Sequence, residues 1–439
     1  MAAIEKFRSR ICFLLMLLSL AVFATAPAAD ELPDYVIEQF GAPPPIPDGP
    51  ISAELDAALR VAFVDFFETG VWDGDQREAL EIIVQAKDPR AAWVITDMMR
   101  FSFNSSFDRD LAVATSDLLG VELRARFNWN NLTDHLIAWD VPAFPGYLEI
   151  KRAIFTAFVP GWEEIFVEGD IDWRLVSWGG VLIDDRAYDT TDERCNCIPA
   201  ADNPEVIPAA EATWPSDDAI VFGIELNGEF RAYPRQIMEV REMVNDTLGG
   251  RDLAIPYCTL CGAAQAYFTD NLPDGVERPI MRTSGLLIRS NKVMYDIETN
   301  SVFDTFLGKA VTGPLAEIGL QLEQATVITT DWGTWRREHP ETTVLVEPLS
   351  LGFNPDFRNG RDANGPIFPV GDVDPRLPVH EDVIGVITAS GAPWAFQRTA
   401  AMAALLSGGD VSVENIRLEL SGGGIRAVDT SGENLGSHE

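Results

Sequence analysis

The pattern of hydrophobic residues divides the chain into a helical part and a later strand-rich part. Between residues 51 and 165, apolar residues recur every three or four positions, which is the spacing of amphipathic helices. The first of these helices has an apolar face made of Leu55, Leu59, Phe63 and Phe66. We expect Ser52 to cap its start and Gly70 to end it. Successive short helices of this kind predict a HEAT-like α-helical domain over residues 51–165.

Beyond residue 166 the apolar residues alternate as in strands and are separated by short turns. Two apolar runs, 220–226 and 229–233, flank Asn227-Gly228, the preferred pair for a type I′ turn, and so predict a β-hairpin. We expect a helix from Arg235 to Val244 to follow it. The order of elements predicts an α+β fold in which the helical domain precedes a strand-rich mixed domain over residues 166–439.

A Cys-x-x-Cys sequence lies between two short apolar runs of this second domain. Leu253 to Ile255 is expected to form a strand that enters the sequence, and Ala263 to Phe268 a strand that leaves it. Cys258 and Cys261 lie three residues apart, and Gly262 permits a tight turn. This spacing suits a redox-active dithiol, a structural disulfide or half of a metal site.

An internal repeat sets these cysteines apart from the scaffold. The segment 221–233 resembles the segment 383–396, and each is followed by a helix, a glycine pair and a strand. The glycine pairs matched in this way are Gly249-Gly250 and Gly408-Gly409. The second copy continues as Val413 to Leu420 and contains no cysteine. The repeat therefore predicts that the fold does not require thiols, which favours a functional role for them.

The segment between the two copies supplies candidate neighbours for the thiols. Residues 282–303 are expected to form a strand, a tight turn and a second strand. Asp296 and Thr299 are placed to hydrogen-bond a turn backbone. In the alternative interpretation, a buried Asp296 is aimed at the thiols, with Ser284 and Tyr295 as further neighbours.

The first 28 residues have the composition of a secretory signal peptide, and a proline-rich linker over residues 29–50 follows them. Basic residues precede an apolar run from Ile11 to Ala24, which is too short to cross a bilayer. The sequence thus predicts a periplasmic or extracellular protein without membrane insertion after signal removal. The formal net charge of −35 excludes nucleic acid as a partner, because its phosphate backbone would be repelled.

Several motifs of the strand-rich domain together resemble one bacterial family. They are Trp178-Gly-Gly-Val, Ile198-Pro-Ala-Ala-Asp-Asn-Pro204, Arg231-Ala-Tyr-Pro234, Val244-Asn-Asp-Thr-Leu-Gly-Gly250 and Tyr257-Cys-Thr-Leu-Cys-Gly262. The combination, over roughly residues 170–350, resembles DUF3179, a family of unknown function. The resemblance implies an exported protein and no established activity. The chain departs from the family at Arg241, where a histidine is expected, and at Cys195 and Cys197, where aspartate and glycine are expected.

Four cysteines remain after signal removal, as Cys195-x-Cys197 and Cys258-x-x-Cys261. In an oxidising compartment we expect disulfides between the two motifs, within about 7 Å between Cα atoms, because a bond inside Cys-x-Cys closes a small, strained ring. That arrangement predicts a disulfide-stabilised scaffold or binding protein. The alternatives are a redox dithiol and a thiolate site for zinc or copper(I). The helical domain is the candidate surface for a protein partner.

Overall fold

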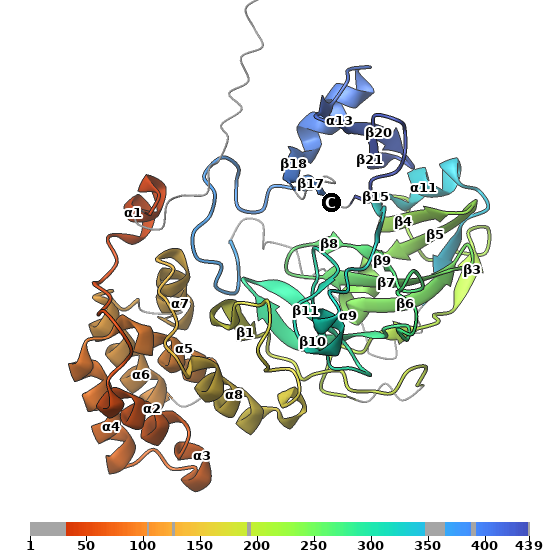
Figure 1. Ribbon diagram of the computed structural model, residues 1–439. Coiled ribbons are helices and arrows are strands. Elements are labelled where there is room, and N and C mark those ends of the chain that lie inside the picture. Colours follow the sequence, from red (N-terminus) through yellow and green to blue (C-terminus); the bar gives the residue numbers. More distant parts are fainter. Residues whose placement is uncertain are drawn as a thin grey trace, which may run out of the picture.

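The computed structural model has helices in the N-terminal part of the chain and several β-sheets in the rest, which confirms the α+β class (Figure 1). The structure describes residues 32–102, 105–124, 128–190, 195–346, 365–387 and 392–437. The expected signal peptide lies outside these ranges. None of the helices within them is long and apolar enough to cross a membrane.

The helical part runs from α1 to α8. Its helices are α1 (Asp34–Phe40), α2 (Ala53–Phe63), α3 (Phe66–Thr69), α4 (Gly74–Ala86), α5 (Ala92–Met99), α6 (Ser105–Leu119), α7 (Asn128–Ala138) and α8 (Tyr147–Phe158). Ser52 caps α2, as predicted, by accepting a hydrogen bond from the N–H of Leu55. Only the separate short helix α3 reaches Gly70, because α2 ends at Phe63, where two successive N–H groups share the carbonyl of Arg60. The HEAT-like repeat stays a prediction.

Three sheets make up most of the strand-rich part. The first has the order β1 (Val176–Trp178), β10 (Met281–Ile288), β11 (Asn291–Asp296), β12 (Val302–Asp304) and β13 (Lys309–Ala310). The second has the order β14 (Gln324–Ala325), β9 (Ala266–Phe268), β7 (Arg251–Cys258), β6 (Met243–Leu248) and β2 (Ala201–Asp202), with β8 (Ala263–Ala264) paired to β7. The third has the order β15 (Ile328–Asp331), β4 (Ile220–Leu226), β5 (Glu229–Pro234), β16 (Thr343–Leu345) and β3 (Val206–Pro208).

The second sheet is the middle layer, and its strand β7 is buried on both faces. Leu253 and Ile255 pack in a core with residues of the third sheet. Ala254, which lies between them, packs in a different core with Met281 and Met294 of the first sheet. Successive side chains of a strand point to opposite faces, so this alternation decides which layer each residue of β7 meets.

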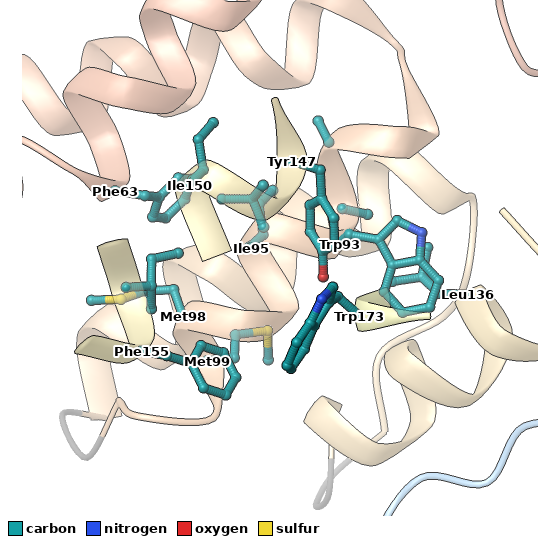
Figure 2. Close-up of a cluster of buried hydrophobic side chains, with 14 of the residues drawn as sticks. Phe63, Trp93, Ile95, Met98, Met99, Leu136, Tyr147, Ile150, Phe155 and Trp173 are labelled. Carbon is teal, nitrogen blue, oxygen red and sulfur yellow. The ribbon is translucent and has the colours of Figure 1, made fainter. Parts of the chain in front are cut away.

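The first sheet has the helical part on its other side, and the two share one hydrophobic core. Trp93, Met98 and Phe155 contribute to this core from the helices (Figure 2). Val176 of β1 and Val293 of β11 contribute to it from the sheet. The helices therefore cover the face of the first sheet that does not contact the second sheet.

A buried ionic cluster also joins the helical part to the first sheet. The ammonium of Lys151 donates hydrogen bonds to Asp97 at 2.6 Å, to the Tyr147 hydroxyl at 3.1 Å and to the Val176 carbonyl at 2.7 Å. Lys151 is fully buried. Burial lowers the pKa of Lys151 and raises the pKa of Asp97, while the opposite charge of each residue counteracts the shift of the other.

The C-terminal unit repeats the hairpin, helix and hairpin of β4–β5, α9 (Arg235–Arg241) and β6–β7. Its elements are β17 (Val383–Ile387), β18 (Pro393–Gln397), α13 (Arg398–Leu406), β19 (Ser412–Val413), β20 (Ile416–Ser421) and β21 (Gly424–Asp429). The predicted match of glycine pairs is wrong, because Gly249-Gly250 joins two hairpin strands and corresponds to Gly422-Gly423, not to Gly408-Gly409. The helix from Arg235 is also shorter than predicted, because Glu242 takes up a left-handed conformation and ends it.

We predict that Lys151→Met lowers the free energy of unfolding by about 3–5 kcal/mol, because the variant leaves the buried Asp97 carboxylate without its counter-charge. Urea denaturation at neutral pH measures the change. Lys309→Met is the matched control, since Lys309 pairs with Asp170 at the surface and its loss should change stability little. Equal effects of the two substitutions would contradict the assignment.

Candidate dithiol site

The Cys-x-x-Cys sequence forms the turn between β7 and β8, as the two flanking apolar runs predicted. Cys258 lies four residues beyond Ala254, so the alternation along β7 directs its side chain toward the first sheet. The N–H of Gly262 donates to the carbonyl of Cys258 at 2.7 Å and closes the turn. Gly262 has a φ of 73°, a left-handed conformation that glycine adopts at little cost.

Cys258 and Cys261 are reduced thiols in contact with each other. Their sulfur atoms lie 3.0 Å apart, and the backbone N–H of Cys261 donates to the sulfur of Cys258 at 3.4 Å. The side chain of Cys258 is buried, whereas Cys261 is only half-buried. A partner molecule therefore reaches the sulfur of Cys261 more easily than that of Cys258.

The turn between β10 and β11 lies against the two sulfurs. Its central residues, Arg289 and Ser290, have φ values of 43° and 68°, as a type I′ turn requires. The carbonyl oxygen of Ser290 lies 3.9 Å from the sulfurs of both Cys258 and Cys261. The side-chain oxygen of Asn291 lies 3.5 Å from the sulfur of Cys261. Both S–H groups, which are weak donors, thus have acceptors in this turn.

Two charged residues that the sequence analysis did not select, Glu242 and Lys292, complete the site. The carboxylate of Glu242 accepts a hydrogen bond from the hydroxyl of Thr259 at 2.5 Å. The ammonium of Lys292 donates to the backbone carbonyl of Glu242 at 2.5 Å and lies 3.8 Å from its carboxylate. Lys292 is buried, and it occupies an inward position of β11, two residues before Met294. The sequence signal that could have identified Lys292 is a charged residue at a strand position whose side chain faces a core.

The pKa values in the site depend on burial and on hydrogen bonds. Burial raises the pKa of the Cys258 thiol, and the charge of Glu242 does the same. Hydrogen bonds from Cys261 and from the backbone N–H of Lys292 outweigh both effects and lower the pKa overall. Burial lowers the pKa of Lys292 to about 8, although the negative groups of Glu242, Cys258 and Asp184 oppose this shift. The site therefore makes the Cys258 thiol more acidic than an ordinary cysteine.

Cys195 and Cys197 form a disulfide with each other, so the expected bonds between the two motifs are wrong. Their Cα atoms lie 5.1 Å apart, which is within the normal range for a disulfide despite the small ring. Cys258, by contrast, is directed into the layer between the first and second sheets. The pairing follows from these separate surroundings and not from the number of cysteines.

The described residues contain one group of potential metal ligands, formed by Asp184, Cys195 and Cys197. Asp184 is fully buried and accepts hydrogen bonds from the Arg186 guanidinium at 2.6 and 2.9 Å. It also accepts one from the N–H of Ala200 at 2.8 Å. The charge of this carboxylate is already balanced by the Arg186 guanidinium, and the two sulfurs beside it are bonded to each other. The group therefore does not fit a thiolate metal site.

The other predicted neighbours have structural roles. The hydroxyl of Ser284 donates to a backbone carbonyl of β11 at 2.6 Å. The hydroxyl of Tyr295 donates to the carbonyl of Asp184 at 2.7 Å. Asp296 accepts a hydrogen bond from the N–H of Thr299 at 3.0 Å, which confirms the predicted turn. These bonds hold the first sheet in shape beside the thiols, where Lys292 is the charged neighbour.

The fold and site define a strand-rich α+β protein with a dithiol between two of its sheets. Residues 195–438 match the family described as "Protein of unknown function (DUF3179)". The match covers more than half of the chain, so the chain belongs to the DUF3179 family. The match begins after the Trp178 motif and extends past the other motifs to include the C-terminal unit. No curated protein and no solved structure matches the chain.

We predict that peptide mapping under mild oxidation finds Cys195 joined to Cys197 and Cys258 joined to Cys261. The reason is that each pair is already in contact within its own motif. Mass spectrometry of a non-reduced digest checks this, with a reduced and alkylated digest as the control. A main product that links one motif to the other would contradict the arrangement.

Proposed function

We propose that the protein is a thiol–disulfide redox protein that works through Cys258 and Cys261. The observation that carries the proposal is the contact of two reduced thiols, with 3.0 Å between their sulfurs, in a closed turn. A disulfide has a bond length of about 2.05 Å, so a shift of about 1 Å joins these sulfurs. The lowered pKa of Cys258 supports the proposal, because the thiolate is the reactive form of a cysteine.

The reaction we propose transfers two electrons between this pair and a disulfide of a partner protein. The accessible Cys261 loses its proton and attacks one partner sulfur, so that a mixed disulfide forms. The displaced partner sulfur leaves as a thiolate and takes up a proton. The Cys258 thiolate then attacks the sulfur of Cys261, and the second partner sulfur leaves and is protonated. The products are the Cys258–Cys261 disulfide and a partner dithiol, and the reverse reaction oxidises such a dithiol.

The distance between the sulfurs favours this chemistry over zinc binding. Two thiolates bound to a tetrahedral zinc at about 2.3 Å hold their sulfurs about 3.8 Å apart. The observed separation of 3.0 Å is shorter than this. Within the part of the chain that the structure describes, Cys258 and Cys261 also belong to no group of three potential ligands. A zinc or copper(I) site there remains the alternative proposal, with less support.

The position of the disulfide argues against the scaffold interpretation. Cys195 and Cys197 are two residues apart, and the stabilisation that a disulfide provides grows with the length of the loop it closes. This bond therefore adds little to the stability of the fold. The export that the sequence predicts would bring the dithiol into a compartment where disulfide partners are common.

We predict that Cys258→Ser traps a mixed disulfide with a disulfide-containing substrate protein. Without the sulfur of Cys258, the intermediate at Cys261 is not resolved. Cys261→Ser should trap at least about tenfold less, because its remaining sulfur is buried. Non-reducing electrophoresis and mass spectrometry measure the trapped complex.

The matched control for this experiment is the Cys195→Ser/Cys197→Ser double variant, which should exchange disulfides like the parent protein. Equal trapping by the two single variants would contradict the assigned order of attack. Failure of the parent protein to exchange disulfides, together with one tightly bound zinc, would instead support the metal site.

A further inference from the structure

The dithiol lies beside two opposite charges that no sequence motif assigns to it, and their role rests on the proposed function. We infer that Lys292 and Glu242 are positioning residues of the dithiol. The buried ammonium of Lys292 stabilises the Cys258 thiolate by charge. Glu242 holds this ammonium in place, and its own negative charge limits the stabilisation.

The alternation along β11 brings Lys292 to this place. Val293 packs in the core shared with the helices, whereas Met294 packs in the core between the first and second sheets. Lys292 lies two residues before Met294 in the strand, so the two side chains point to the same face, toward the second sheet and β7. The Glu242 carbonyl that accepts from the Lys292 ammonium at 2.5 Å also accepts from the N–H of Tyr257, so the ammonium lies beside the residue that precedes Cys258. The pKa values respond to this arrangement, because the backbone of Lys292 lowers the pKa of Cys258 and the charge of Cys258 raises the pKa of Lys292.

Glu242 connects this lysine to the Cys-x-x-Cys turn. Its φ of 50° is a left-handed conformation that is unfavourable for residues other than glycine. In this conformation its carbonyl accepts hydrogen bonds from the Lys292 ammonium at 2.5 Å and from the N–H of Tyr257 at 2.9 Å. Its carboxylate accepts the bond from Thr259 at 2.5 Å. These contacts fix Lys292 and the residues on both sides of Cys258 relative to one another.

The charged groups around the pair determine how the effect depends on pH. The pKa of Cys258 responds to Cys261, Glu242 and Lys292, and the pKa of Lys292 responds to the charges of Glu242, Cys258 and Asp184. Lys292 has a pKa of about 8, lowered chiefly by burial, so it is charged at neutral pH and loses its charge as the pH rises through 8. The stabilisation of the thiolate is therefore present below about pH 8 and is lost above it.

The test is a titration of the reduced protein in which the ultraviolet absorbance of the thiolate is followed against pH. Every protein carries Cys195→Ser and Cys197→Ser, so that only the dithiol titrates. Lys292→Met should lower the thiolate fraction at neutral pH about tenfold, and Lys292→Arg, which keeps the charge, should restore it. Glu242→Gln removes the charge that raises the pKa of Cys258, so in the acidic part of the titration, where Lys292 stays charged, it should raise the fraction, the opposite change. Lys309→Met is the control for loss of a surface lysine and should titrate like the parent.

An unchanged titration of folded Lys292→Met, checked by circular dichroism, would overturn the inference. If that variant does not fold, Glu242→Gln decides, since a purely structural role would leave its thiolate fraction unchanged or reduced. The inference and the proposed function fail separately. If the Lys292→Met and Glu242→Gln variants change the thiolate fraction in opposite directions but the parent protein exchanges no disulfides, the roles of the two charges stand and the redox function is wrong. If the parent protein exchanges disulfides but the variants do not change the thiolate fraction, the redox function stands and the roles of the two charges are wrong.

Discussion

The burial of β7 on both faces is the constraint on which the rest of the site depends. Leu253 and Ile255 pack toward the third sheet, and Ala254 packs toward the first. The side chain of Cys258 points to the same face of β7 as that of Ala254, so its sulfur lies between two packed sheets. An isolated charge would be costly there. The hydrogen bonds from Cys261 and Lys292 make a thiolate tolerable there. Packing thus gives the two cysteines different surroundings, one enclosed and one accessible.

The helical part supports this site from a distance. Its core continues into the first sheet, and the ammonium of Lys151 is bonded to the Val176 carbonyl in β1. β1 pairs with β10, and the β10–β11 turn places the carbonyl of Ser290 against both sulfurs. The packing that holds the helices on the sheet therefore also holds the β10–β11 turn, whose carbonyl lies against the two sulfurs. This continuity gives the helical part a structural role in the site, whether or not it binds a partner.

Features set by neighbouring residues could be predicted from the sequence. The Asn227-Gly228 hairpin, the Ser52 cap and the turn at Asp296 each depend on a few adjacent residues. The contact between Lys292 and Glu242 joins residues 50 positions apart and depends on how two sheets stack, so local patterns did not reveal it. The disulfide pairing was wrong for the same reason. Residue spacing indicates a strained ring for Cys195 and Cys197, but it does not show that two packed sheets enclose Cys258.

The most direct test of the account is an equilibrium redox titration of the protein in glutathione buffers. The state of each cysteine would be read by alkylation and mass spectrometry. The account predicts that Cys258 and Cys261 convert together, reversibly and in one two-electron transition, from dithiol to a disulfide with each other. A dithiol that stays reduced at every buffer ratio, or that oxidises only by linking to Cys195 or Cys197, would contradict it.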